Sequence, residues 1–303
     1  MTTPAHTNKA THTYDVIYVG NYTKDTIVTP AGTHYVDGGA VNYAAHAGAR
    51  LGCHVAVVTR LAQEDYERVV GAWRAEGVDC LVRITPQSTC VKLEYPTTNV
   101  DVRNLYVTST AGSITVDEVQ GISCLASVIG TTLRGEIEME AIQTLRNRSG
   151  LLAADAQGFV RVLEGQDLAY RPWQAMSEVL QLLDVFKVDI KEAEFLTGTS
   201  DIHEAAQDLA TYGPKEVLLT HQDGLLVYAH GEFHAARFYS KIMNGRSGRG
   251  DTCTGAYVAK RLSASPAEAT RWAAALTSLK MENEGPFKRS LSEVVQLVES
   301  KYR

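Results

Sequence analysis

The chain has 303 residues, of which 45% are apolar, and it carries a net charge of −6 with an isoelectric point of about 5.9. This length and composition predict a globular α/β domain with an insertion, or two small domains. The mild acidity and the lack of any run of four Lys or Arg residues argue against general binding to nucleic acids or membrane surfaces.

The cysteines and the N-terminal residues predict a soluble cytoplasmic protein. The five cysteines are odd in number and contain no C-x-x-C pair, so reduced thiols are favoured over a zinc site or disulfides. Residues 1–12 are polar and lack the apolar core of a signal peptide, and no apolar run approaches 18 residues. We expect these first twelve residues to be disordered.

The first eighty residues alternate between strand and helix patterns. Buried strands are predicted at residues 14–19 and 54–59, and helices at residues 40–51 and 64–76, closed by Gly52 and Gly77. This alternation is typical of a parallel sheet covered by helices.

Two stretches break that alternation. Residues 80–113 hold three short runs rich in Val, Thr and Tyr, and residues 26–36 are similar. Both are typical of antiparallel strands with one partly polar face. We therefore expect a main α/β domain of residues 13–25, 38–79 and 114–303, and a small β-sheet lid of residues 26–37 and 80–113.

The α/β pattern returns after Val116. Further strands are predicted at residues 127–129, 151–154, 184–188 and 216–220. Helices are predicted near residues 136–147, 173–183, 191–197, 202–211, 254–262, 266–282 and 291–300.

The strongest local signal is the turn Gly248-Arg249-Gly250, which is followed by Asp251 and a predicted helix. Glycines let successive N–H groups point one way, and a helix N-terminus adds unpaired N–H groups and a positive dipole end. The segment predicts an anion site for a phosphoryl group in transfer, with Asp251 placed to accept a proton from an attacking hydroxyl. A glycine-rich loop capped by Asp251 is the plainer alternative, and an adhesion tripeptide would need secretion.

A second signal lies where the first strand ends and the first long helix begins. Gly38, Gly39 and Asn42 stand at a strand-to-helix turn, and Asp25 follows the first strand. Ligands of open α/β sheets bind outside the carboxyl ends of the strands, so these residues are candidates for a polar ligand site. Each element alone is also compatible with an ordinary turn.

Residues 155–161 follow another predicted strand and reach the same edge of the sheet. Gln157 can hydrogen-bond hydroxyls, and Arg161 can pair with a phosphate. The alternative is a loop with a surface arginine.

Two common nucleotide-binding classes are excluded by their motifs. The chain contains no G-x-x-x-x-G-K-[ST] segment, so it is not a P-loop protein. No G-x-G-x-x-G segment follows the first strand, which disfavours a Rossmann dehydrogenase.

In this order, the elements resemble the PfkB family of ribokinase-like carbohydrate and nucleoside kinases over residues 14–287. The family's first-strand Gly and Asp match Gly20 and Asp25, and its G-G-x-x-x-N-x-A element matches residues 38–44. Residues 187–198 are similar to K-x-N-x-x-E-x-x-x-L-T-G, and residues 247–251 to T-G-A-G-D. The resemblance implies a three-layer α/β/α domain with a mostly parallel central sheet and a small β-sheet lid.

The resemblance also implies roles for individual residues. Asp251 would be the base, beside an anion hole of Gly248, Arg249 and Gly250, and Glu192 would organise Mg²⁺ through water. Substrate hydroxyls would be bound by Asp25, Gly38, Gly39 and Asn42, and the nucleotide would be flanked by Asp189, Thr220, Gly224 and Asn283.

The chain departs from the family pattern near the donor. Asp189 replaces an Asn, Arg249 replaces a small residue, and the turn from Thr220 to Gly224 is one residue shorter and lacks a glycine. These departures leave the phosphate donor open.

We expect an ATP-dependent, Mg²⁺-requiring kinase that phosphorylates a hydroxyl of a sugar or cyclitol, with a monovalent cation such as K⁺ as a further candidate cofactor. The alternatives are a nucleoside kinase of the same fold and a catalytically silent, ligand-binding homologue. The expected partner is a small polyol, sugar or nucleoside, without nucleic acid or membrane, and an exposed lid edge invites a homodimer.

Overall fold

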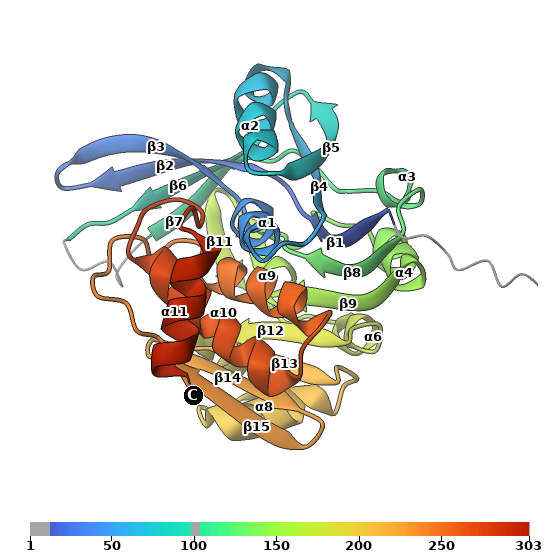
Figure 1. Ribbon diagram of the computed structural model, residues 1–303. Helices are drawn as coiled ribbons and strands as arrows, with labels where there is room; N and C mark the ends of the chain where they lie inside the picture. The colour runs from blue at the N-terminus through green and yellow to red at the C-terminus, as the bar shows by residue number, and fades with distance from the viewer. Residues whose placement is uncertain (1–12, 98–103, 303) are drawn as a thin grey trace, which may run out of the picture.

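The computed structural model describes residues 13–97 and 104–302, which form a central sheet, two helical layers and a second, smaller sheet (Figure 1). The expected disorder of residues 1–12 lies outside the described residues. All five cysteines lie inside them and form no disulfide within the described residues.

The central sheet has nine strands in the order β15-β14-β13-β12-β9-β8-β1-β4-β5. All neighbours from β13 to β5 are parallel, and β14 and β15 are added antiparallel. The strands are β1 Tyr14–Val19, β4 Val55–Ala62, β5 Val78–Thr85, β8 Cys124–Ile129, β9 Ser149–Asp155, β12 Val185–Asp189, β13 Glu216–Thr220, β14 Gly224–Ala229 and β15 Glu232–Arg237.

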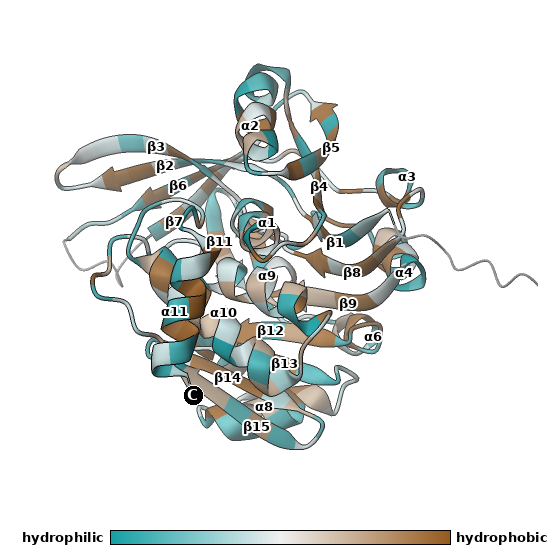
Figure 2. Ribbon diagram, in the orientation of Figure 1, coloured by the Kyte–Doolittle hydropathy of each residue, from teal (hydrophilic) through white to brown (hydrophobic). Residues whose placement is uncertain are grey.

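Helices cover both faces of this sheet, so the predicted three-layer α/β/α architecture is confirmed. Alternate strand residues separate into two cores, with Val16 and Tyr18 of β1 on one face and Ile17 and Val19 on the other. The strands lie between the helical layers and carry much of the hydrophobic surface (Figure 2).

The helices of the first core are α1 Ala40–Arg50, α2 Gln63–Ala75, α9 Arg249–Arg261, α10 Pro266–Met281 and α11 Leu291–Lys301. Those of the second core are α3 Val116–Val119, α4 Met139–Arg148, α5 Gln157–Val160, α6 Met176–Leu180, α7 Ile190–Thr197 and α8 Ile202–Ala210. The described residues contain no helix long and apolar enough to cross a membrane.

The second sheet has six strands in the order β10-β11-β7-β6-β2-β3. They are β2 Thr23–Thr29, β3 Gly32–Gly38, β6 Thr89–Glu94, β7 Asn104–Ser109, β10 Arg161–Glu164 and β11 Asp167–Tyr170. A small core of its own contains Val91, Leu93 and Val107 from this sheet and Leu133 from the main domain.

The composition of this second sheet differs from the predicted lid in three ways. Residues 78–85 pair with β4 over eight positions in the central sheet, so β5 is not part of the lid. The hairpin of β10 and β11 joins the second sheet from the main domain. Strand β2 pairs with β6 in parallel, because the chain continues into them from β1 and β5, which run in the same direction.

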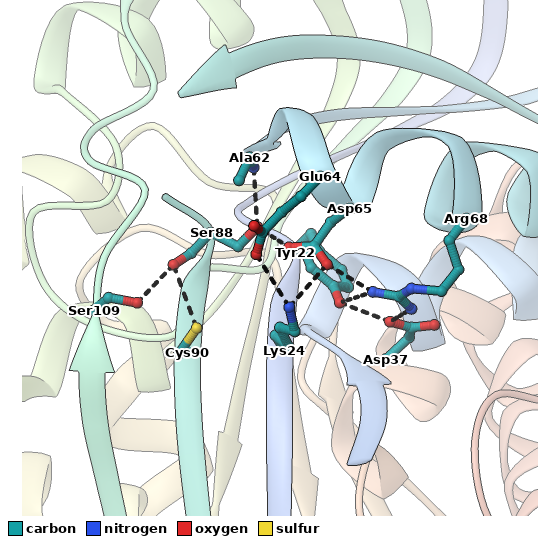
Figure 3. Close-up of polar contacts among 10 residues, drawn as sticks. All are labelled: Tyr22, Lys24, Asp37, Ala62, Glu64, Asp65, Arg68, Ser88, Cys90 and Ser109. Atoms are coloured by element: carbon teal, nitrogen blue, oxygen red, sulfur yellow. Dashed lines mark hydrogen bonds and ion pairs between the residues drawn. The ribbon is translucent and has the colours of Figure 1, made fainter. Parts of the chain in front are cut away.

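A polar cluster at the end of the second sheet that meets α2 attaches this sheet to the helix (Figure 3). Asp65, 2% exposed, accepts hydrogen bonds from Arg68 (2.8 Å) and Ser88 (2.6 Å) and lies 3.2 Å from the Lys24 ammonium. Arg68 also donates to Asp37 of β3. Three strands of the second sheet or their ends are thus held at one helix of the main domain.

Candidate active site

Asp25 lies in β2, the strand that follows β1 in the chain. It contacts the Gly38-Gly39 turn, which joins β3 to α1. An ideal Cβ at Gly38 would lie 2.2 Å from Oδ2 of Asp25, so only glycine leaves room for that carboxylate. Gly39 is the N-cap of α1 with a φ of 95°, and a Cβ there would lie 2.8 Å from the carbonyl oxygen of Asn21. The two glycines therefore allow β2 and α1 to approach closely around Asp25.

Asn42 faces the protein interior, which corrects its expected role in binding substrate hydroxyls. Its Nδ2 donates to the carbonyl oxygen of Asp37 at 2.8 Å, and its Oδ1 accepts from Nε1 of Trp73 at 2.7 Å. The side chain is 2% exposed. Both ends of the amide are engaged within the protein, so Asn42 stabilises the turn before α1.

Helix α9 begins at Arg249, five residues earlier than the sequence pattern predicted. Gly248 is its N-cap with a φ of 75°, and an ideal Cβ there would lie 2.2 Å from the ring of Tyr43. A Cβ at Gly250 would lie 2.8 Å from the ammonium of Lys187. Asp251 therefore stands in the first helical turn, where free N–H groups and the helix dipole attract negative charge.

The side chain of Arg249 lies toward the hairpin of β13 and β14. Its guanidinium is 6.0 Å from the ring centroid of Phe238. Burial lowers the pKa of His221 in that hairpin, and the positive charge of Arg249 lowers it further. Arg249 thus adds positive charge on the side of the α9 N-terminus that faces this hairpin.

A buried cluster of charged groups lies beneath the first turn of α9. The Lys187 ammonium is 2.9 Å from Oδ2 of Asp155 and 3.7 Å from Oε2 of Glu192. Arg161 forms an ion pair with Glu192, with 3.1 Å between Nη2 and Oε1. These side chains come from β9, β10, β12 and α7, and Lys187 and Asp155 were not among the predicted site residues.

Gln157 connects this cluster to the candidate base. The segment after β9 is the short helix α5 rather than a loop, and it brings Nε2 of Gln157 within 3.5 Å of Oδ1 of Asp251. The backbone N–H of Gln157 donates to Asp155 at 3.0 Å. Gln157 therefore lies beside Asp251 and can orient its carboxylate.

The environment of Asp251 favours proton uptake. Burial raises its pKa, and the positive charges of Lys187 and Arg161 oppose part of that rise. Asp155 and Glu192 raise the pKa of Lys187 despite the opposing effect of burial, so the lysine stays charged. A carboxylate with a raised pKa beside fixed cations suits a general base in phosphoryl transfer.

The described residues do not fit a directly bound divalent metal. No group of three or more His, Cys, Asp or Glu side chains within residues 13–97 and 104–302 could hold one. Glu192 is fully buried, and its oxygens already contact Arg161, Lys187 and the N–H of Asp189. Glu192 thus takes part in ion pairs and in the capping of α7, and its expected role in organising Mg²⁺ through water stays a prediction.

Three of the predicted nucleotide-flanking residues, Asp189, Thr220 and Gly224, lie at the ends of strands. Asp189 caps α7 and accepts from the N–H of Glu192, and Thr220 is buried and donates to the carbonyl of Val188. Gly224 starts β14 and follows Thr220 across a tight turn.

Asn283 follows α10. The carbonyl oxygen of Asn283 would lie 1.8 Å from a Cβ at Gly245, so it contacts the segment that leads into α9. Its expected contact with a nucleotide stays a prediction.

A cavity of about 380 Å³ opens between the second sheet and the segment before α9. Asp25, Tyr43, Tyr95, Arg246, Lys280 and Glu284 contribute to its wall. Asp25 and Asp251 both raise the pKa of Tyr43, after the larger effect of burial, which places both carboxylates near this phenol. Asp25 thus borders the cavity, and Asp251 lies near Tyr43 of its wall.

Several wall residues were not among the predicted site residues. Tyr43 and Met243 are aromatic or apolar residues near turns, where packing is the usual role. Lys280 had a detectable signal, since it lies at helical spacing from Leu276 and Thr277 on the buried face of α10, where a lysine is rare.

Comparisons with known proteins agree with this arrangement. A family model described as pfkB family carbohydrate kinase matches residues 11–291. Because this match covers most of the chain, the chain belongs to the pfkB family of carbohydrate kinases. A comparison with curated protein sequences gave no match.

Solved structures of the ribokinase family superimpose over nearly the whole chain. One is a pyrophosphate-dependent kinase complexed with a pyrophosphate analogue and myo-inositol, 35% identical, covering 93% of this chain and 99% of that chain with a TM-score of 0.86. A variant of a pyrophosphate-dependent myo-inositol-1 kinase is 34% identical, covering 95% and 100% with a TM-score of 0.86. Arabidopsis thaliana ribokinase with ribose and ATP is 17% identical, covering 94% and 99% with a TM-score of 0.74, and shares the fold.

Fold, family and neighbours together define the class of protein. The chain is a ribokinase-like phosphotransferase whose acceptor is a hydroxyl group, and it is a carbohydrate kinase by family.

Proposed function

We propose that this kinase phosphorylates a hydroxyl of a cyclitol, with Asp251 as the general base. The observation that carries the proposal is the position of Asp251, in the first turn of α9 beside Gly248 and Gly250 and above a cluster of fixed cations. The acceptor hydroxyl would give its proton to Asp251 while its oxygen bonds to the transferred phosphorus. The bond from phosphorus to the donor's leaving oxygen breaks in the same step.

The α9 N-terminus would stabilise the charge that develops on the phosphoryl oxygens. The N-terminus of a helix presents backbone N–H groups, and the helix dipole is positive there. Lys187 and Arg161 add positive charge at short range of Asp251. Gln157 would hold the carboxylate of Asp251 toward the acceptor.

A small polyol suits the cavity beside this site. Its volume of about 380 Å³ lies within the range of small-molecule sites, and Asp25 and Glu284 supply acceptors for hydroxyl groups. Tyr43 and Tyr95 add flat apolar surface. Because a relative of 35% identity is complexed with myo-inositol, we propose a cyclitol ahead of a linear sugar or a nucleoside.

For the donor we propose pyrophosphate ahead of ATP. The two relatives reported above at 35% and 34% identity are described as pyrophosphate-dependent. Arg249 extends from α9 toward the β13–β14 hairpin, where the sequence resemblance would place a nucleotide, and a cation there suits a bare phosphate. ATP is the second candidate, because Thr220 and Asp189 lie paired at the carboxyl edge of the sheet, as a nucleotide site of this fold would require.

In this proposal Mg²⁺ binds to the phosphate oxygens of the donor and not directly to the protein. Phosphate oxygens are the hard ligands that Mg²⁺ prefers, whereas Glu192 is already occupied by cationic side chains. No catalytic step is assigned to a protein-bound metal.

A phosphorylation screen tests the proposal. The purified protein is incubated with pyrophosphate, ATP or GTP and with myo-inositol, other inositols, pentoses, hexoses or nucleosides, and products are followed by ³¹P NMR. We expect the highest kcat/KM for pyrophosphate with an inositol. ATP turnover ten times faster than pyrophosphate turnover would overturn the donor assignment, and preference for a nucleoside would overturn the acceptor class.

A further inference from the structure

Lys280 of α10 places a buried ammonium group against backbone carbonyls. Its Nζ donates to the carbonyl oxygen of Gly245 at 2.6 Å and to that of Ser247. The ring of Tyr43 lies on another side, with 5.0 Å between Nζ and the centroid. The lysine is 2% exposed.

These surroundings are of the kind that hold a bare monovalent cation. Carbonyl oxygens replace the water shell of such an ion, and an aromatic face attracts it further. Here the positive charge is covalently attached to α10 instead. The two carbonyl oxygens accept hydrogen bonds from Lys280, so they are not available to a second cation at the same place.

The carbonyls belong to the segment that leads directly into the anion site. Ser247 precedes Gly248, the N-cap of α9, and Gly248 packs against the same Tyr43 ring that borders the ammonium. The N–H of Gly245 donates to the carbonyl of Met281 at 2.9 Å, which ties the other end of the segment to α10. The Lys280 ammonium is thus placed to fix the path of the chain into the first turn of α9.

We propose that the Lys280 ammonium acts as a built-in monovalent cation that positions the Gly245–Ser247 segment, and that the enzyme therefore needs no K⁺. This corrects the expectation of a monovalent cation cofactor, because the carbonyls do not fit a free ion while Lys280 occupies them. Lys280 is a positioning residue in this scheme, since it acts through the loop that leads to Asp251. The activity readout depends on the proposed function, whereas the stability readout does not.

The charge of Lys280 gives the scheme a pH signature. Burial lowers the pKa of Lys280 to about 8, and Asp251 and Glu284 partly oppose that change. A lysine is positive below its pKa, so the built-in cation is lost as the pH rises through about 8. The charged or titratable groups that face Lys280 or share its cavity are Asp25, His34, Tyr43, Tyr95, Arg246, Asp251 and Glu284.

The first measurement uses the wild-type protein. Thermal melting and turnover are followed at pH 7 while K⁺ is exchanged for tetramethylammonium at constant ionic strength. We expect kcat and KM to change by less than twofold and the melting temperature to change by less than about 1 °C. Activation by K⁺ of more than fivefold would overturn the proposal.

Two variants then separate the charge from the space it fills. Lys280→Ala removes the ammonium and leaves room for an ion, whereas Lys280→Met keeps most of the volume without the charge. We expect both variants to lose at least tenfold in kcat without K⁺. K⁺ or NH₄⁺ should restore Lys280→Ala saturably and raise its melting temperature, and should do neither for Lys280→Met.

The third measurement is the dependence of the rate on pH above pH 8. The wild-type rate should fall above pH 8, and Lys280→Ala saturated with K⁺ should lack that fall. A folded Lys280→Ala that is fully active without added cation, or that neither K⁺ nor NH₄⁺ restores or stabilises, would overturn the proposal. If Lys280→Ala does not fold, the wild-type cation exchange still decides between a built-in and an exchangeable ion.

Discussion

Lys187 and Asp155 form a buried ion pair beneath the first turn of α9, with 2.9 Å between Nζ and Oδ2. Their side chains are 6% and 3% exposed, and Glu192 lies on the other side of the same ammonium. A single lysine thus neutralises two carboxylates that water cannot reach.

Lys187→Met should therefore destabilise the protein strongly. Removing one partner of a buried pair leaves an uncompensated charge, which costs roughly 3–5 kcal/mol. Urea unfolding measures the loss. Lys215→Met is the matched control, because Lys215 also pairs with an aspartate at 2.8 Å but is 68% exposed, and an exposed pair contributes about 0–1 kcal/mol. Equal losses for the two variants would contradict the importance of burial.

Asp251→Asn tests the proposed base. The variant keeps the shape of the side chain but cannot accept the acceptor's proton, so kcat should fall by roughly 10²–10⁴-fold while donor binding survives. Single-turnover kinetics and donor titration by calorimetry measure the two effects. A variant with near-normal kcat would show that another group takes the proton.

The same aspartate predicts the acid limb of the pH profile. Because burial raises the pKa of Asp251, the native state holds its proton to higher pH than the unfolded chain does. The rate should therefore begin to fall with decreasing pH above the ordinary pKa range of aspartate. At neutral pH the buried charge costs stability, so Asp251→Asn should melt higher than the wild type. A lower melting temperature would argue that the carboxylate has a structural role.

Asp25→Asn tests the acceptor end of the site. Asp25 borders the cavity and packs against Gly38, so loss of its charge should raise the acceptor KM at least tenfold with little change in the donor KM. Initial-rate kinetics with both substrates varied measure this. Asp37→Asn is the control, since Asp37 lies on β3 but pairs with Arg68 at α2. Equal effects of the two changes would remove Asp25 from the acceptor site.

The parts that sequence alone could predict are those with a local pattern. Strands such as 14–19 and helices such as 266–282 follow from local runs of residues, and the structure confirms them. The assignment of residues 80–85 to the lid was wrong. Their alternation of polar and apolar residues predicts a strand but does not tell which neighbouring strand it pairs with. Only the parallel pairing of β5 with β4, set by tertiary packing, decides that.

The candidate site shows the same limit at the level of side chains. A glycine turn before an acid was visible in the sequence as an anion site. The partner of Arg161 was not visible, because Glu192 lies thirty-one residues away and they meet only through the fold. For Lys280 the sequence shows only a lysine on an apolar helix face, whereas its partners, the backbone carbonyls of Gly245 and Ser247, leave no mark in the sequence.

Glu136 predicts a pH-dependent stability that is separate from catalysis. This carboxylate is 2% exposed, contacts the amide of Asn21 at 3.3 Å, and accepts from the backbone N–H of Thr132. Burial raises its pKa from 4.5 to about 7, although these hydrogen bonds act in the opposite direction. Between these two values the native state binds more protons than the unfolded chain, so the free energy of unfolding falls as the pH rises.

The comparison of Glu136→Gln with the wild type isolates this effect. This rise of the pKa from 4.5 to about 7 corresponds to roughly 3 kcal/mol, most of which should be lost from the wild type between pH 5 and pH 8. The Gln variant lacks that titration, so its unfolding free energy should gain on the wild type by roughly 2–3 kcal/mol over the same range. Urea unfolding at pH 5, 6, 7 and 8 measures both curves, with Glu140→Gln on the exposed face of α4 as the control. Parallel curves for wild type and Glu136→Gln would mean that the carboxyl keeps an ordinary pKa, and the hydrogen bonds from Asn21 and Thr132 would then outweigh its burial.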